Sequence, residues 1–111
     1  MAYDEELAER VRAEVAGERA LTEMTMFGGL AFLVGGHMAV AVSGQGGLML
    51  RCDPDDTETL LDEPGAGPMV MRDKEMRGWL RVGADAVADD EALRAWVQRG
   101  TAYARSLPPK G

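Results

Sequence analysis

The sequence is poor in the residues that most often mark catalytic, metal-binding or secreted proteins. It contains one cysteine, Cys52, and one histidine, His37, among 111 residues. A single cysteine excludes an intramolecular disulfide, which favours a reducing, cytoplasmic environment. No apolar run approaches the roughly 20 residues of a membrane-spanning helix. The acidic start also lacks the apolar core of a signal peptide. We therefore expect a cytoplasmic protein without a membrane anchor.

Positive charge is scarce as well. Twelve Lys and Arg residues stand against 19 Asp and Glu, which gives a formal net charge of −7. This excess repels phosphate backbones and disfavours direct nucleic-acid binding in the absence of a local basic patch. The 46% hydrophobic and 28% charged shares are ordinary for a globular protein. A chain of this length builds a core without metal or disulfide help. We expect one domain over residues 1–111.

Hydrophobic periodicity and turn signals predict three helices and five strands. The first helix begins after Asp4 and stops near Gly17, the second is short and begins after Asp53, and the third covers about Asp89–Ser106. The predicted strands are 30–34, 37–42, 48–52, 69–72 and 77–82. Strands grouped between helices favour an antiparallel sheet with helices mainly on one face. The fold class is therefore α+β, two-layered, in the order α-β-β-β-α-β-β-α.

The turns predict how the strands face. Gly35-Gly36 is typical of a two-residue hairpin turn, which sets Phe32 opposite Ala39. A loop over residues 43–47 then sets Val40 opposite Leu50. Side chains alternate between the faces of a sheet, so one face is predicted to pack under the helices. That face carries Ala31, Leu33, Met38, Val40, Val42, Leu48, Leu50 and Cys52.

The other face is also largely apolar, although the second face of a two-layer domain normally meets water. An exposed apolar sheet face is typical of an interface. The predicted interface residues are Leu30, Phe32, Val34, Ala39, Ala41 and Met49. Two alternatives stay open. Loops or a terminus could cover this face, and a one-residue slip in either hairpin would exchange the two faces.

Several residues are of types that occur in binding, metal or catalytic sites. Arg51, Arg81, Trp79 and His37 could form an anion or small-ligand site at one end of the sheet, although ion pairs with the many acids also explain the arginines. Cys52 could act as a nucleophile only with a base nearby, and its apolar strand favours a buried thiol. His37 and Cys52 fall on opposite predicted faces, which disfavours a shared metal. We predict no catalytic residue, no cofactor and no metal.

Other patterns have simpler explanations. Ser43, His37 and Asp53 supply the letters of a catalytic triad, but Ser43 is not in a nucleophile elbow. The glycine-rich segment 44–47 precedes a strand, whereas phosphate loops precede a helix. The acids after residue 52 suit helix capping better than a calcium loop. The eight methionines suit either core packing or an adaptable binding surface.

Three stretches together resemble one family. They are Met26-Phe27-Gly28-Gly29-Leu30-Ala31-Phe32, then Ser43 to Arg51, then Met69 to Arg72 with Met76 to Val82. They are similar to the N-terminal domain of the TfoX/Sxy competence regulators, over essentially the whole chain. The resemblance implies a two-layer α+β fold with an antiparallel sheet and no catalytic residues. Phe27, Gly28 and Gly29 match its signature, which we interpret as structural.

Longer members of that family regulate natural competence in bacteria together with a transcription activator, and they carry a second, C-terminal domain. This chain is expected to be a stand-alone N-terminal domain. The leading hypothesis is a non-enzymatic protein-interaction or regulatory module that pairs with itself, as a dimer, or with another protein. The alternative is a small-ligand or anion-binding domain.

Overall fold

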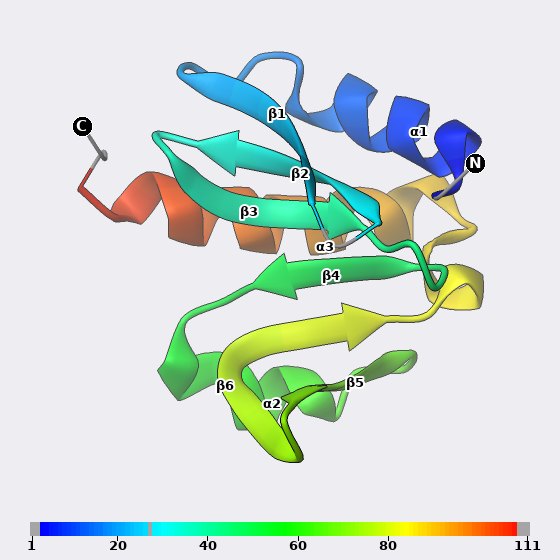
Figure 1. Cartoon of the computed structure of the whole chain (residues 1–111), viewed down its shortest axis with the longest axis vertical. Coiled ribbons are helices and arrows are strands. Elements are labelled where there is room, and N and C mark those ends of the chain that lie inside the picture. The colour runs from blue at the N-terminus through cyan, green and yellow to red at the C-terminus, as the bar shows by residue number, and fades with distance from the viewer. Residues whose placement is uncertain (1–2, 27, 109–111) are drawn as a thin grey trace.

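The fold is given by a computed structural model that describes residues 3–26 and 28–108 (Figure 1). The helices are α1 (Glu5–Val15), α2 (Thr57–Leu61) and α3 (Asp90–Ser106). The strands are β1 (Leu21–Met26), β2 (Gly29–Val34), β3 (His37–Val42), β4 (Leu48–Arg51), β5 (Ala66–Met71) and β6 (Lys74–Val82). Two short 3-10 helices, Pro54–Asp56 and Ala84–Val87, precede α2 and α3.

All neighbouring strands are antiparallel, in the order β1-β2-β3-β4-β6-β5. The α+β fold and the antiparallel sheet are confirmed, but the predicted count of five strands is wrong because β1 adds a sixth. Strand β1 escapes the sequence patterns because it is mostly exposed and mixes Thr and Glu with its apolar residues. It therefore shows neither a continuous apolar run nor a clean alternation.

The helix starts follow the predicted capping chemistry. The Asp4 carboxylate accepts a hydrogen bond from the Leu7 backbone N–H at 3.1 Å, and Asp89 accepts one from Ala92 at 3.1 Å. Asp53 caps the 3-10 turn before α2 in the same way. Such caps satisfy backbone donors that the first helical turn leaves unpaired. The predicted N-caps Asp4 and Asp53 are therefore confirmed, and Asp89, predicted only as the approximate start of the last helix, caps α3.

The helices pack on one face of the sheet and form the main core with it. In Figure 1, α3 crosses behind the middle strands, and α1 lies beside it. The core takes Val11 and Val15 from α1, and Leu93, Trp96 and Val97 from α3. The sheet contributes side chains that are buried almost completely, among them Phe32, Val40, Val42, Leu48, Leu50, Leu80 and Val82. Burying these residues supplies most of the driving force for folding.

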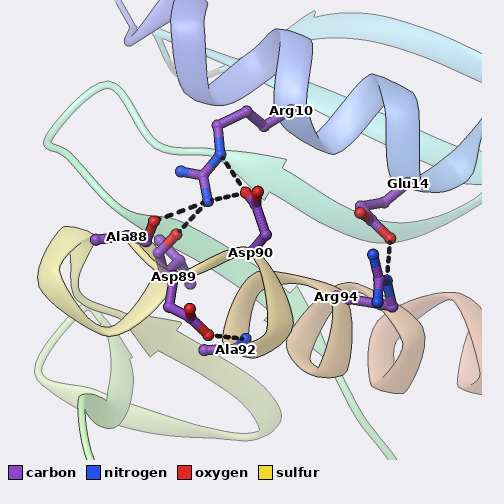
Figure 2. Close-up of polar contacts among 8 residues, drawn as sticks. Arg10, Glu14, Ala88, Asp89, Asp90, Ala92 and Arg94 are labelled. Atoms are coloured by element: carbon purple, nitrogen blue, oxygen red, sulfur yellow. Dashed lines mark hydrogen bonds and ion pairs between the residues drawn. The ribbon is translucent and has the colours of Figure 1, made fainter.

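Helix α1 is tied to α3 by charged side chains as well as by the core. Figure 2 shows Arg10 reaching from α1 to the start of α3, where its guanidinium donates to the Asp90 carboxylate and to the Val87 and Ala88 carbonyls. The three ion pairs between this end of the chain and α3 are Arg10–Asp90, Glu14–Arg94 and Glu18–Arg105. Arg10 and Glu14 belong to α1, and Glu18 to the turn after it, so these pairs add modestly to the packing of this end of the chain against α3.

The register of β2 against β3 differs from the predicted one. The two-residue turn is confirmed, since Val34 pairs with His37 and both Gly35 and Gly36 have positive φ. The ladder then shifts by one residue, so that Leu33 pairs with Met38 but Phe32 pairs with Val40. Ala39 is the extra residue of this β-bulge. The predicted pairs Val40–Leu50 and Val42–Leu48 between β3 and β4 are confirmed.

The bulge exchanges the two faces of β2, and the predicted faces are corrected accordingly. Leu30, Phe32 and Val34 belong to the main core, as does Ala39 itself, although all four were predicted on the open face. Conversely, the residues predicted under the helices but found on the open side are Ala31, Leu33 and Met38. Ala41 and Met49 lie on the open side, as the predicted register placed them.

Candidate interaction surface

The sheet face opposite the helices carries a second apolar cluster. Its buried centre consists of Ala31, Ala41 and Met49, which come from three neighbouring strands. Partly buried apolar side chains pack around this centre: Met26, Leu33, Met38 and Met69. Met24 lies on the same face, because it pairs with Ala31 across β1 and β2. Its side chain is 48% exposed. We refer to these eight residues as the methionine face.

The shape of this surface follows from its residue types. Small alanines occupy the middle strands, and longer, flexible side chains surround them. Methionine has three rotatable bonds and a polarisable sulfur, so a ring of methionines can adapt to the shape of whatever packs on it. An apolar cluster left on the solvent side of a sheet is typical of a binding surface.

Arg81 stands at the margin of the methionine face. Its guanidinium donates to the Ser43 hydroxyl at 3.0 Å and to the Gln45 side-chain carbonyl at 3.2 Å, and it contacts the Met49 sulfur at 3.8 Å. These contacts hold the loop between β3 and β4 against the end of β6. The Ser43 hydroxyl also accepts the Gln45 backbone N–H, so it is already occupied by two donors.

The structure does not bring the four residues of the predicted anion site together in one place. Arg51 and Trp79 pair across β4 and β6, and the Arg51 guanidinium lies 5.5 Å from the centres of the Trp79 and Tyr103 rings. Such cation–π contacts hold Arg51 in place. Arg81 instead contacts the loop after β3. His37 contacts the Pro108 carbonyl, 2.6 Å from Nε2.

Several other arginines form ion pairs with acids, which was the alternative explanation for the basic residues. Arg77 reaches Asp55 and Glu58, and Arg99 reaches Glu63. Sequence reasoning missed Tyr103, Ser43 and Gln45 as partners of Arg51 and Arg81. No local pattern signals these partners, because each is distant along the chain from the arginine that it contacts.

The structure does not bring Ser43, His37 and Asp53 together as a catalytic triad. Ser43 contacts Arg81, His37 contacts Pro108, and Asp53 caps its own helix through the Asp55 N–H. Within residues 3–26 and 28–108, no three His, Cys, Asp or Glu side chains gather as metal ligands would. None of the helices in the described part of the chain is long and apolar enough to cross a membrane.

Cys52 is buried below the start of α2. It is 2% exposed, and its sulfur lies 3.8 Å from the Thr57 hydroxyl. Burial raises the pKa of the Cys52 thiol, and neighbouring acids raise it further, against a hydrogen bond with Thr57 that lowers it. A buried thiol with a raised pKa is a weak nucleophile, because the thiolate is the reactive form.

We expect native Cys52 to react slowly with iodoacetamide at pH 8. Reaction requires local opening of the fold and a thiolate, so the folded protein should react at least about tenfold more slowly than the unfolded protein. Mass spectrometry over time, with and without denaturant, measures both rates. Equal rates would contradict the buried placement of Cys52.

The TfoX N-terminal domain family matches residues 13–104, from the last turn of α1 to the last turn of α3. The chain belongs to the TfoX N-terminal domain family. Comparison with curated proteins and with solved structures gives no match.

The match includes every strand of this TfoX N-terminal domain and therefore the whole methionine face. Phe27, part of the sequence signature, lies outside the described residues. Gly29 is buried between strands, and a Cβ there would lie 2.3 Å from the Val42 carbonyl oxygen. This close approach gives Gly29 a packing role in the fold.

Proposed function

We propose that this TfoX N-terminal domain is a non-enzymatic, cytoplasmic regulatory module that acts in the control of competence by binding a protein partner. The partner places the apolar side of a helix on the methionine face. The family membership supports the regulatory role. The observation that carries the binding surface is the apolar cluster on the side of the sheet that α1, α2 and α3 leave uncovered.

A helix is the occupant that this surface fits. Apolar faces of sheets are normally buried against helices or a second sheet, and here only one face has its helical layer. The partly buried methionines that cover the two buried alanines are flexible, so they can adapt to the side chains of a helix laid across the strands. The net charge of −7 disfavours nucleic acid as the direct partner.

Complementation of a deletion strain of the source organism tests this proposal. Wild-type protein should restore the transcripts that the deletion lowers, and Met38→Asp should fail to restore them, because a charge on the methionine face cannot be buried under a helix. The matched control is Val70→Asp, which adds the same charge at an apolar residue that is 53% exposed and outside the face.

Circular dichroism and accumulation in the cell must show that both variants are folded and present. Restoration by Met38→Asp as complete as by the wild type would overturn the proposal. Failure of Val70→Asp to the same degree would also overturn it, because the effect would then not be specific to the methionine face. Separately, transcripts unaffected by the deletion would overturn the regulatory role.

A further inference from the structure

The two edges of the sheet are protected unequally. The edge strands are β1 and β5, and each carries an exposed large apolar residue, Met24 and Val70 respectively. Edge strands expose unpaired backbone groups, and proline and bulges are common devices that prevent pairing with another chain. Strand β5 has both, since Pro68 lacks an N–H and the register shifts between Pro68 and Val70. Strand β1 has neither device.

Strand β1 is regular along its length. Its six residues pair with β2 in consecutive register, from Leu21–Val34 to Met26–Gly29. The Gly35 N–H donates to the Ala20 carbonyl at 3.1 Å, which makes Ala20 and Gly35 a hydrogen-bonded pair. Because such pairs alternate with non-hydrogen-bonded ones in an antiparallel ladder, Thr22, Met24 and Met26 direct their backbone groups to β2.

The backbone groups of the alternate residues, Leu21, Glu23 and Thr25, therefore point outward from the sheet. Among the residues that the structure describes, no loop, turn or side-chain hydrogen bond reaches them. The Glu23 side chain is held away from this edge, because its carboxylate accepts two hydrogen bonds from Arg12 of α1, at 2.7 and 2.9 Å. The ion pair partly offsets the negative charge of Glu23, the one charge in the strand, but the carboxylate stays ionised.

We propose that β1 pairs with β1 of a second copy of this chain, antiparallel, across a two-fold axis at Met24. The outward backbone groups of Glu23 and Thr25 then form hydrogen bonds with those of Thr25 and Glu23 in the second copy. Met24 packs against its own counterpart, which covers one of the two exposed large apolar residues. The two sheets join edge to edge and place their methionine faces side by side.

Two alternative two-fold registers, with the axis at Glu23 or at Thr22, are less favourable. An axis at Glu23 would place the two Glu23 carboxylates directly opposite each other, and like charges in that position destabilise a sheet. An axis at Thr22 would extend the pairing to Ala20, whose φ of 57° is incompatible with a strand. The axis at Met24 avoids both problems and pairs residues 22–26.

This inference does not rest on the proposed function, because it concerns the backbone edge of β1 rather than the occupant of the methionine face. Disulfide trapping tests it directly. In the proposed register, Met24 and its counterpart are a non-hydrogen-bonded pair with Cα atoms about 4.5 Å apart. That separation lies within the range of about 4.4–6.8 Å that a disulfide spans.

The variant is Met24→Cys in the full chain, and the matched control is Val70→Cys at the opposite edge. Native Cys52 is buried and contributes little background. Under mild oxidation we expect Met24→Cys to shift to a reducible dimer on a denaturing gel, while Val70→Cys stays monomeric. Equal cross-linking of the two variants, or none in Met24→Cys, would overturn the proposal.

A second measurement uses the wild-type protein and needs no substitution. Amide hydrogen exchange by NMR should become slower at Glu23 and Thr25 as protein concentration rises, because their N–H groups are paired only in the dimer. The Met24 amide, which bonds to β2, should be protected at every concentration. Exchange at Glu23 and Thr25 that is independent of concentration would overturn edge pairing, whatever the outcome of the complementation experiment.

Discussion

Replacing Phe32 with aspartate will unfold the domain. Phe32 is fully buried in the main core, between the sheet and the helices. The substitution removes a large aromatic side chain and buries a charge without a partner, which together cost about 5 kcal/mol or more. Domains of this size are stable by only about 5–15 kcal/mol in total. Loss of the cooperative unfolding transition in circular dichroism would show the effect.

The adjacent substitution, Leu33→Asp, is the matched control. Leu33 is only partly buried and lies on the methionine face, where an aspartate can reach water. We expect a folded protein with a free energy of unfolding lowered by about 1–2 kcal/mol. Unfolding by Leu33→Asp together with tolerance of Phe32→Asp would mean that the β-bulge at Ala39 is absent and that the two faces are exchanged.

Replacing Gly100 with alanine will destabilise the protein, against the usual effect of this substitution in a helix. Alanine is favoured over glycine in a helix interior by about 1 kcal/mol. At Gly100, however, a Cβ would lie 2.4 Å from the Ala39 carbonyl oxygen in β3. Backbone cannot move aside as a flexible side chain can, so α3 must shift away from the sheet. We expect a net loss of about 2 kcal/mol in urea unfolding.

Gly17→Ala provides the control for Gly100→Ala. A Cβ at Gly17 meets nothing within 4 Å, and its φ is not in the left-handed region. The alanine should leave stability unchanged or raise it by about 0.5 kcal/mol, because it restricts the unfolded chain. An equal loss of stability in both variants would exclude the contact between Gly100 and Ala39 as the cause.

The sequence was sufficient to predict elements whose signals are local. The capping residues Asp4 and Asp53 and the helix start near Asp89 were predicted because each of these side chains bonds to a backbone group within three residues. The pairing of β3 with β4 followed from a loop whose length could be read directly. The β-bulge could not be predicted in this way, since Ala39 has no residue type that requires a bulge. The bulged residue lies against Gly100 of α3, a long-range contact that no local pattern indicates.

The candidate surface was predicted only in part for the same reason. An apolar second face was expected, and Ala41 and Met49 lie on it. Because of the extra residue in β3, however, Leu33 rather than Phe32 lies on this face beside them. Strand β1 was missed entirely, and with it the unprotected edge. The contacts of Arg81 and Arg51 involve partners that are distant in the sequence, and hydrophobic periodicity does not predict such contacts.

The ion pairs that join α1 and the turn after it to α3 have a consequence for the order of folding. Arg10 and Glu14 pair with residues that are 80 positions later, and Glu18 with one that is 87 positions later. Helix α1 and the turn after it therefore cannot make these ion pairs until the α3 residues that carry their partners have been synthesised. Contacts this distant in the sequence form late in folding, since the chain between them must first be ordered.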